Sequence, residues 1–175
     1  MADILPEKWM KGVAMTTTVL AVLTSIASSR AGFCVAKAQL LTALEGSKWA
    51  YYQAKSIKHN LLETQAKAFE VQMVGLQNPE QQARLESELK SAQAELARYD
   101  TEKNQIKQEA EEFGKKNAVV GRQGGQFSLA VVFFQIGIML SSVSALLKRK
   151  ELWALGALFG IVGIVFLVNG LFLLF

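Results

Sequence analysis

The sequence predicts an all-α chain with three transmembrane helices and a long antiparallel coiled-coil helical hairpin inserted between the first and the second. Three observations indicate this fold class: two charge-free apolar stretches at the end, a weaker one near the start, and a heptad repeat in the polar region between them. We expect an N-terminal flank with the first span at 1–29, the extramembrane hairpin at 30–126 with its turn at 76–79, and a transmembrane hairpin at 127–175.

The first span is predicted at 12–29, a stretch without charges that is rich in threonine and serine. Membrane helices tolerate these residues because their hydroxyls bond to the preceding turn or to a neighbouring helix. The alternative is a cleaved signal peptide, with Lys8 and Lys11 as its basic region and a small-residue cleavage site at 25–27. We expect an uncleaved membrane helix.

The polar region is predicted to form two helices that fold back on each other at a tight turn. Asn78 is a good N-cap, Pro79 suits the first helical position, and Glu80 suits the positive end of the helix dipole. Gly75 can end the preceding helix. At 1.5 Å per residue the two arms would reach about 60–70 Å from a membrane.

Both arms carry residues at alternating spacings of four and three, the heptad pattern of coiled coils. On the second arm we expect the seam at Leu85, Leu89, Ala92, Leu96, Tyr99, Lys103, Ile106, Ala110 and Phe113. On the first arm we expect it at Ala36, Leu40, Ala43, Ser47, Ala50, Ala54, Ile57, Leu61, Thr64, Ala68 and Val71. Folding the chain at the turn would then pair small side chains with large ones, as Ala50 with Ile106, which favours close packing.

The stretch 46–58 of the first arm combines large aromatic side chains with lysines. One interpretation is that the aromatics cover the seam beneath lysine stems; the other is that another chain covers them. A narrow, alanine-rich hairpin is a poor core by itself, so we favour an interface at Trp49, Tyr51, Tyr52 and Lys55. Substrate binding is least favoured, because no set of acids, bases or metal ligands accompanies the aromatics.

The order of these elements, together with W-A-Y-Y-Q-A-K-S-I-K at 49–58, resembles a bacterial family of short three-span membrane proteins, family four-three-three-seven of the domains of unknown function. The resemblance covers most of the chain. It implies a multi-pass protein of the bacterial inner membrane, and it implies neither an activity nor catalytic residues.

The sequence contains no motif that indicates catalysis, so we expect no enzyme activity, no catalytic residue, no metal and no cofactor. His59 is the only histidine, which argues against a zinc site, and we expect it to be solvated. The glycine-rich stretch 121–125 is interpreted as a flexible joint between arm and membrane. The net charge of +4 does not indicate nucleic acid, because the charges of the hairpin region are nearly balanced.

The two terminal spans, 127–147 and 152–175, hold no charged side chain, and each matches the roughly 20 apolar residues that cross a bilayer. A Lys-Arg-Lys-Glu loop joins them. In the last span Gly156, Gly160 and Gly163 would let helix backbones approach closely, and we expect them at an interface. Intramembrane polar contacts are expected at Thr17, Thr24, Gln135 and Asn169.

Basic residues are densest at Lys8, Lys11 and 148–150, which predicts a cytoplasmic N-terminus and a periplasmic hairpin. The expected function is that of a non-enzymatic oligomeric scaffold or accessory subunit, with membrane lipids, further copies or other membrane subunits as partners. The alternative is a homo-oligomeric channel, transporter or stator-like unit. A scaffold predicts the hydroxyls of the first span buried against protein, whereas a channel predicts them facing a wet axis.

Overall fold

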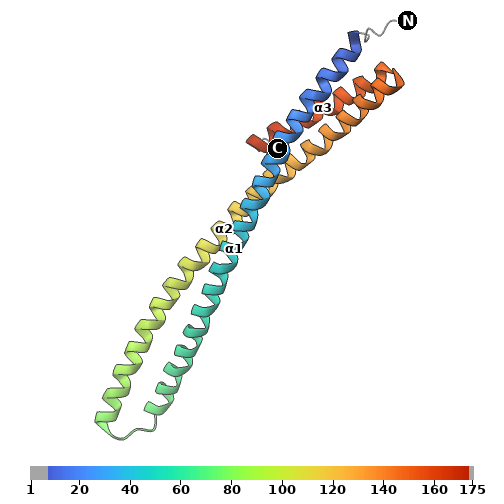
Figure 1. Ribbon diagram of the computed structural model, residues 1–175. Coiled ribbons are helices and arrows are strands. Elements are labelled where there is room, and N and C mark those ends of the chain that lie inside the picture. Colours follow the sequence, from blue (N-terminus) through green and yellow to red (C-terminus); the bar gives the residue numbers. More distant parts are fainter. Residues whose placement is uncertain (1–7, 174–175) are drawn as a thin grey trace, which may run out of the picture. The chain divides into compact units, whose positions relative to one another are not determined.

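The computed structural model describes residues 8–173, and within this range the chain consists of three α-helices and no strand. Helix α1 is Lys8–Met73, α2 is Pro79–Leu147, and α3 is Lys150–Phe172 (Figure 1). The all-α fold class with a long helical hairpin is therefore confirmed.

Each of these three helices contains a stretch that is long and apolar enough to cross a membrane. The mean hydropathy of that stretch is 1.6 in α1, 2.1 in α2 and 2.3 in α3, and the one in α1 lies near the N-terminus. About 20 apolar residues suffice to cross the hydrocarbon core of a bilayer. The chain thus has the composition and helix lengths of a membrane protein.

The chain forms two compact units. Of the described residues, 8–39 and 117–173 make one, which we call the three-helix unit because it contains parts of α1 and α2 and all of α3. Residues 40–116 make the other, which we call the hairpin unit.

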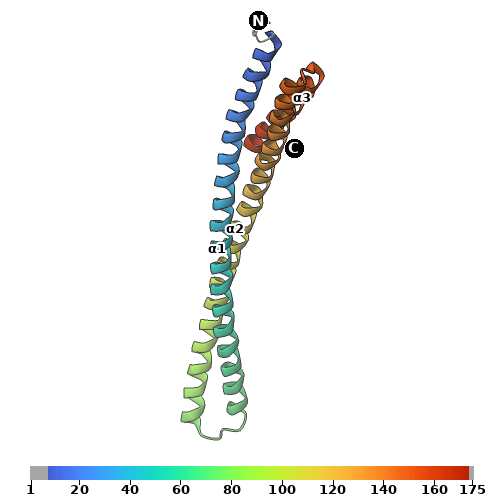
Figure 2. The same ribbon diagram turned by 45° about the vertical axis from the view of Figure 1, so that its right-hand side comes forward.

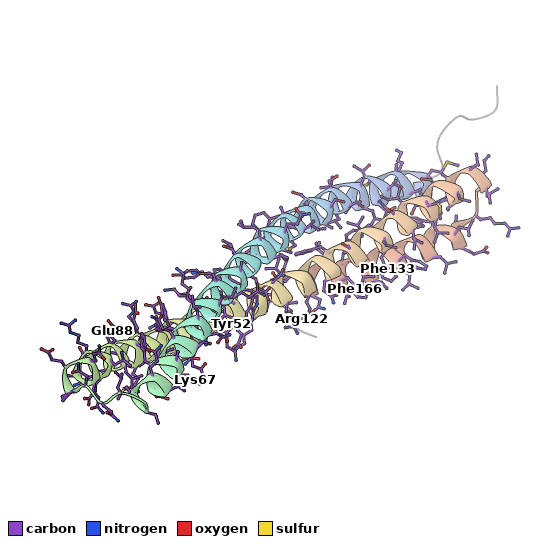
Figure 3. The ribbon with its side chains drawn as sticks, turned by 90° about the horizontal axis from the view of Figure 1, so that it is seen from below. Tyr52, Lys67, Glu88, Arg122, Phe133 and Phe166 are labelled. Carbon is purple, nitrogen blue, oxygen red and sulfur yellow. The ribbon has the colours of Figure 1, made fainter. Side chains whose placement is uncertain are left out.

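The core of the three-helix unit is built from side chains of α1 and α2. Leu20, Ala27, Ala130 and Phe134 are buried together, and partly buried residues of all three helices pack against them. Phe133 of α2 stacks on Phe166 of α3, with ring centroids 5.2 Å apart and an interplanar angle of 5°; both side chains are labelled in Figure 3. Aromatic contact therefore adds to the packing of α2 against α3.

Glycines allow the backbones of α2 and α3 to touch. A methyl group added to Gly137 would lie 2.8 Å from the carbonyl oxygen of Gly156, and one added to Gly156 would lie 2.8 Å from that of Gly137. Further along α3, a methyl group on Gly163 would lie 2.6 Å from the ring of Phe134, which is fully buried. Small residues of this kind are typical of close helix packing in membranes.

The loop between α2 and α3 is shorter than predicted, because it does not include all four residues of the Lys-Arg-Lys-Glu sequence. Helix α2 ends at Leu147, Lys148 adopts a left-handed conformation with φ 55°, and α3 begins at Lys150. The hydroxyl of the buried Ser144 donates a hydrogen bond to the Arg149 carbonyl at 2.7 Å, and the Arg149 amide donates to the Ser144 carbonyl at 3.2 Å. Ser144 thus satisfies backbone groups that the tight loop leaves unpaired.

The expectation of a flexible joint at 121–125 is wrong, because all five residues are helical within α2. Gly124 is buried, and a methyl group there would lie 3.1 Å from Cβ of Cys34 on α1. At this position glycine serves the approach of two helices. The free thiol of Cys34 is buried at the same contact.

In the hairpin unit, α1 and α2 run side by side and are joined by a short turn in both views (Figure 1, Figure 2). The Gly75 amide donates to the Gln72 carbonyl at 3.3 Å as α1 ends. The side-chain oxygen of Asn78 accepts a hydrogen bond of 3.0 Å from the Glu80 amide. Asn78 therefore caps α2 ahead of Pro79, which occupies the first helical position.

The nine seam positions predicted on the second arm are all buried or half-buried in α2. The seam predicted on the first arm is wrong, because every one of its positions is exposed. The face of α1 that is turned inward, here called the inner face, consists of Leu41, Glu45, Lys48, Tyr52, Lys55, His59, Leu62, Ala66, Phe69 and Met73. It also follows the four-three spacing, one or two residues along the chain from the predicted seam, and it includes charged residues whose partners lie on α2.

We predict that Gly163→Ala lowers the thermal unfolding midpoint of the protein in detergent, because its methyl group would overlap the ring of the fully buried Phe134. Overpacking of this kind costs about 1–3 kcal/mol. The control is Gly125→Ala, whose methyl group meets nothing within 4 Å. Equal melting of the two variants would show that the helices do not approach as closely as described.

Candidate functional site

The inner face of α1 faces α2 through charged pairs. Lys48 lies 2.5 Å from a carboxylate oxygen of Glu109, and Lys55 forms an ion pair with Glu102. One turn further along, Nε2 of His59 lies 3.2 Å from a carboxylate oxygen of Asp100. These contacts place three nitrogen-bearing side chains of α1 opposite three acidic side chains of α2. Because the residue numbers rise on one arm as they fall on the other, the pairs fix an antiparallel register.

Lys55 lies at the centre of this arrangement. Its side chain is 18% exposed, and its ammonium lies 4.9 Å from the ring centroid of Tyr99 and 5.7 Å from that of Tyr51. The guanidinium of Arg98 also contacts this group: it lies 5.4 Å from the ring centroid of Tyr99 and 3.5 Å from a carboxylate oxygen of Glu102. The contacts of the Lys55 ammonium with the two tyrosine rings are partly shielded from water, and they add to the attraction between Lys55 and Glu102.

Trp49 and Tyr52 form an edge-to-face pair, with ring centroids 5.6 Å apart and an interplanar angle of 80°. Tyr52, labelled on α1 in Figure 3, belongs to the inner face, whereas Tyr51 is 50% exposed. The predicted residues of this stretch therefore form two contacts, Trp49 with Tyr52 and Tyr51 with Lys55, and Tyr52 and Lys55 lie on the inner face. Replacing Tyr52 would test the cohesion of the hairpin.

The ion pairs displace the titration of their carboxyl groups. The hydrogen bond from Lys55 lowers the pKa of Glu102, and the same hydrogen bond raises the pKa of Lys55. Hydrogen bonds from Lys67 and Lys116 likewise lower the pKa values of Glu63 and Glu112. All of these directions favour the charged forms in the folded hairpin.

The expectation that His59 is solvated is wrong, because its side chain is only 15% exposed. Its Nδ1 atom is buried without a hydrogen-bond partner among the described residues. Lys103, at a seam position of α2, lies 3.6 Å from the same Asp100 carboxylate. Lys55 follows Lys48 by seven residues, and His59 follows Lys55 by four. This helical spacing places the three side chains on one face and is the signal that would have predicted His59 on the inner face.

The glycines predicted at an interface are buried within the three-helix unit. Gly156 packs on Gly137 and Ser141 of α2, and a methyl group on Gly160 would lie 2.8 Å from Leu20 of α1. Together with Gly163 they join α3 to the other two helices of the same chain.

The polar residues predicted in the spans have different surroundings. The hydroxyls of Thr17 and Thr24 donate to the carbonyls of Val13 and Leu20 on their own helix, both at 2.7 Å. Asn169 is fully buried, whereas Gln135 is exposed on the surface of the three-helix unit.

Sequence reasoning missed two buried serines and one contact between helices. Ser141 and Ser144 are fully buried, and the Ser141 hydroxyl has no hydrogen-bond partner in the part of the chain that the structure describes. Trp153 donates through its indole nitrogen to the hydroxyl of Thr16 at 3.0 Å. Ser141 lies on the continuation of the α2 heptads through Phe127 and Phe134, which is a signal for its burial, whereas Ser144 lies outside this spacing.

An apolar groove of about 310 Å³ lies between α1 and α3 in the three-helix unit. It is lined by Met15, Thr16, Val19, Leu20, Leu23, Ala157, Gly160, Ile161 and Ile164. Among the described residues, no group of three or more His, Cys, Asp or Glu side chains could hold a metal ion.

We predict that reversing either charge of the central pair, by Lys55→Glu or Glu102→Lys, lowers the thermal unfolding midpoint. Each reversal places like charges in contact inside the hairpin. The double variant restores opposite charges and should recover most of the loss. If the double variant melts no higher than the worse single variant, the two side chains do not interact in the folded protein.

We predict that the unfolding midpoint falls as the pH drops below about 4.5, the ordinary pKa of a glutamate side chain. Folding lowers the pKa of Glu102, so the unfolded chain binds a proton more readily and acid favours unfolding. The contribution of this pair is present above the unfolded pKa and is lost as the pH falls through the lowered folded value. The variant Glu102→Gln should therefore lose less stability on acidification than the wild type, and an equal loss would contradict the assignment.

A family model described as a domain of unknown function (DUF4337) matches residues 9–173, which is nearly the whole chain. The chain belongs to this family. Neither the search of curated proteins nor the search of solved structures found a match.

Proposed function

We propose that this member of the family is a non-enzymatic integral membrane protein that serves as an oligomeric scaffold or as an accessory subunit of a larger membrane complex. The observation that carries the proposal is the inverted distribution of side chains in the hairpin unit. Lys48 and Lys55 of α1 pair with acidic side chains of α2 on the face that also carries the buried apolar residues, while Ile57 and Leu61 of α1 are each 69% exposed.

This inversion is informative because charged side chains are seldom placed inside unless they are paired, and a row of exposed apolar side chains marks an interaction surface. A hairpin that stood alone in water would be more stable with its aliphatic side chains inside and its lysines outside. The exposed aliphatic side chains are explained if α1 contacts α2 with one face and another protein chain with the opposite face.

The three apolar stretches support insertion in a membrane as a multi-pass protein. We place it in the bacterial inner membrane, with the N-terminus in the cytoplasm and the hairpin in the periplasm. This orientation follows from the density of basic residues at Lys11 and at 148–150, next to the ends of the apolar stretches. The apolar groove between α1 and α3 fits the acyl chain of a membrane lipid.

The threonines of the first span support a scaffold more than a channel. The half-buried Thr16 and Thr24 and the exposed Thr18 each donate a hydrogen bond to a carbonyl of their own helix, and Thr16 also accepts the indole N–H of Trp153. Hydroxyls satisfied in this way need no water-filled axis. The channel, transporter or stator-like function is therefore the less supported candidate.

The proposal is tested by the native mass of the complex extracted from membranes in a mild detergent, with the co-purifying proteins identified. We expect two or more copies of the chain, or one copy bound to other membrane subunits. A single copy without any other protein, in detergent and in lipid nanodiscs alike, would contradict the proposed function.

A further inference from the structure

The exposed face of α1 in the hairpin unit carries a regular row of uncharged side chains, here called the outer stripe. Its members are Leu40, Ala43, Ser47, Ala50, Ala54, Ile57, Leu61, Thr64, Ala68 and Val71. All ten are exposed, and the four with large aliphatic side chains are 60–74% exposed. The row lies away from α2, which contacts the inner face.

The spacing of the outer stripe is three and four residues in strict alternation over the whole length from 40 to 71. A straight helix has 3.6 residues per turn, so a row with a 3.5-residue period keeps facing the same neighbour only when two helices supercoil. The inner face accounts for the supercoiling of α1 with α2. It does not account for apolar residues on the opposite face, where positions are normally polar in a two-helix structure. The outer stripe therefore has the pattern of a second seam.

We propose that the outer stripe is the seam at which α1 helices of different copies of this chain pack in parallel and in register. This inference rests on the proposed function and names the surface through which the scaffold assembles.

The direction of pairing follows from the continuity of α1. The helix runs without interruption from its apolar stretch near the N-terminus to Met73. Copies inserted in one membrane with the same topology carry their α1 helices in the same direction, so equivalent faces meet in parallel. When the copies are in register, each residue of the outer stripe packs against the same residue of the neighbouring copy. None of these residues is charged.

The residues that flank the outer stripe fit this pairing. In a parallel pair, a residue beside one seam meets the residue five positions further along the other helix. Lys58 then faces Gln53 of the second copy, and Lys67 faces Gln72, so no like charges meet. The three acidic residues of α1 in this region, Glu45, Glu63 and Glu70, lie neither on the stripe nor on its flanks.

One flanking pair is complementary in size. Tyr51, which is 50% exposed, would face Gly46 of the second copy, and a side chain starting at Gly46 would meet nothing within 4 Å beyond the adjacent backbone of its own helix. A large ring beside an open glycine suits close packing. In the heptads of the stripe, Leu40 and Leu61 take the first seam position, and Ile57 and Val71 take the second. This order favours three or four helices over two.

The inference is tested by disulfide crosslinking of the full-length protein in membranes, with Cys34 replaced by serine. Ala50→Cys lies on the outer stripe, and the matched control Ala94→Cys replaces an exposed alanine of α2. Parallel register predicts that mild oxidation joins two chains through Ala50→Cys and not through Ala94→Cys. Equal crosslinking at both sites, or none at Ala50→Cys, would overturn the inference.

A second pair of variants gives an independent measurement. Ala54→Lys adds a charge to a seam layer, whereas Ala94→Lys adds one to the exposed surface of α2. Because lysine is a good helix former and both sites are exposed, the single chain keeps its helix content. We expect Ala54→Lys to reduce the native mass to that of one copy and Ala94→Lys to keep the wild-type mass.

The two proposals fail differently. If the wild type contains several copies while Ala54→Lys keeps that mass and Ala50→Cys does not crosslink, the proposed function stands and the seam is wrong. The seam is also wrong if one copy is found bound to other subunits. If the wild type is a single copy without any other protein, both proposals are wrong.

Discussion

The structure of the hairpin depends on where the ammonium group of Lys55 lies. It forms an ion pair with Glu102 and lies 5.7 Å from the ring centroid of Tyr51 and 4.9 Å from that of Tyr99. A charge in such a place is tolerated because it is paired and because the aromatic faces attract cations. The neighbouring pairs, Lys48 with Glu109 and His59 with Asp100, also join the two arms, and their carboxylates are exposed. Together they decide which face of α1 is turned toward α2.

That choice of face determines the properties of the opposite one. With Leu41, Leu62 and the lysines on the inner face, the aliphatic side chains of Leu40, Ile57, Leu61 and Val71 are left on the outer stripe, where nothing in the hairpin unit covers them. A hairpin held by specific charged pairs is defined in register but gains less from burying apolar area than an aliphatic seam would. Assembly through the outer stripe would supply the missing burial, and it would tie the stability of the hairpin to association.

The three-helix unit solves a different packing problem. In a bilayer the lipid tails are as apolar as the side chains, so helices associate through close contact more than through exclusion of water. The contacts of Gly137 with Gly156, and of Gly163 with Phe134, achieve this closeness within one chain. Few of the small residues of α3 are therefore available to pack against another chain. The exposed outer stripe of α1 is the better candidate for a surface of assembly.

The sequence was sufficient for several parts of the fold and insufficient for one decisive part. Long charge-free stretches, the cap at Asn78 and the proline after it are local signals, and local signals do not depend on a partner. The face of the second arm was also predicted, because its heptads carry Leu and Ile on one side and charges on the other.

The face of the first arm was not predicted, because two four-three patterns run along it in parallel. One is apolar and small, and the other contains Lys48, Lys55 and His59. Hydrophobicity favours the first as the inner face. The second is the better fit because it also carries Leu62 and Phe69, and because acidic residues of α2, a distant part of the chain, lie opposite its charges. A candidate site made of residues 47 positions apart, such as Lys55 and Glu102, could not be assembled from either segment alone.

The central claim, that the charged face of α1 is turned toward α2, is tested most directly by crosslinking within one chain. Two double-cysteine variants in a background without Cys34 would be treated with a short bifunctional thiol reagent. Our account predicts an intrachain crosslink for Lys48→Cys with Glu109→Cys and none for Ala50→Cys with Ile106→Cys. The opposite result would place the aliphatic side chains inside the hairpin and would remove the basis for an outer seam.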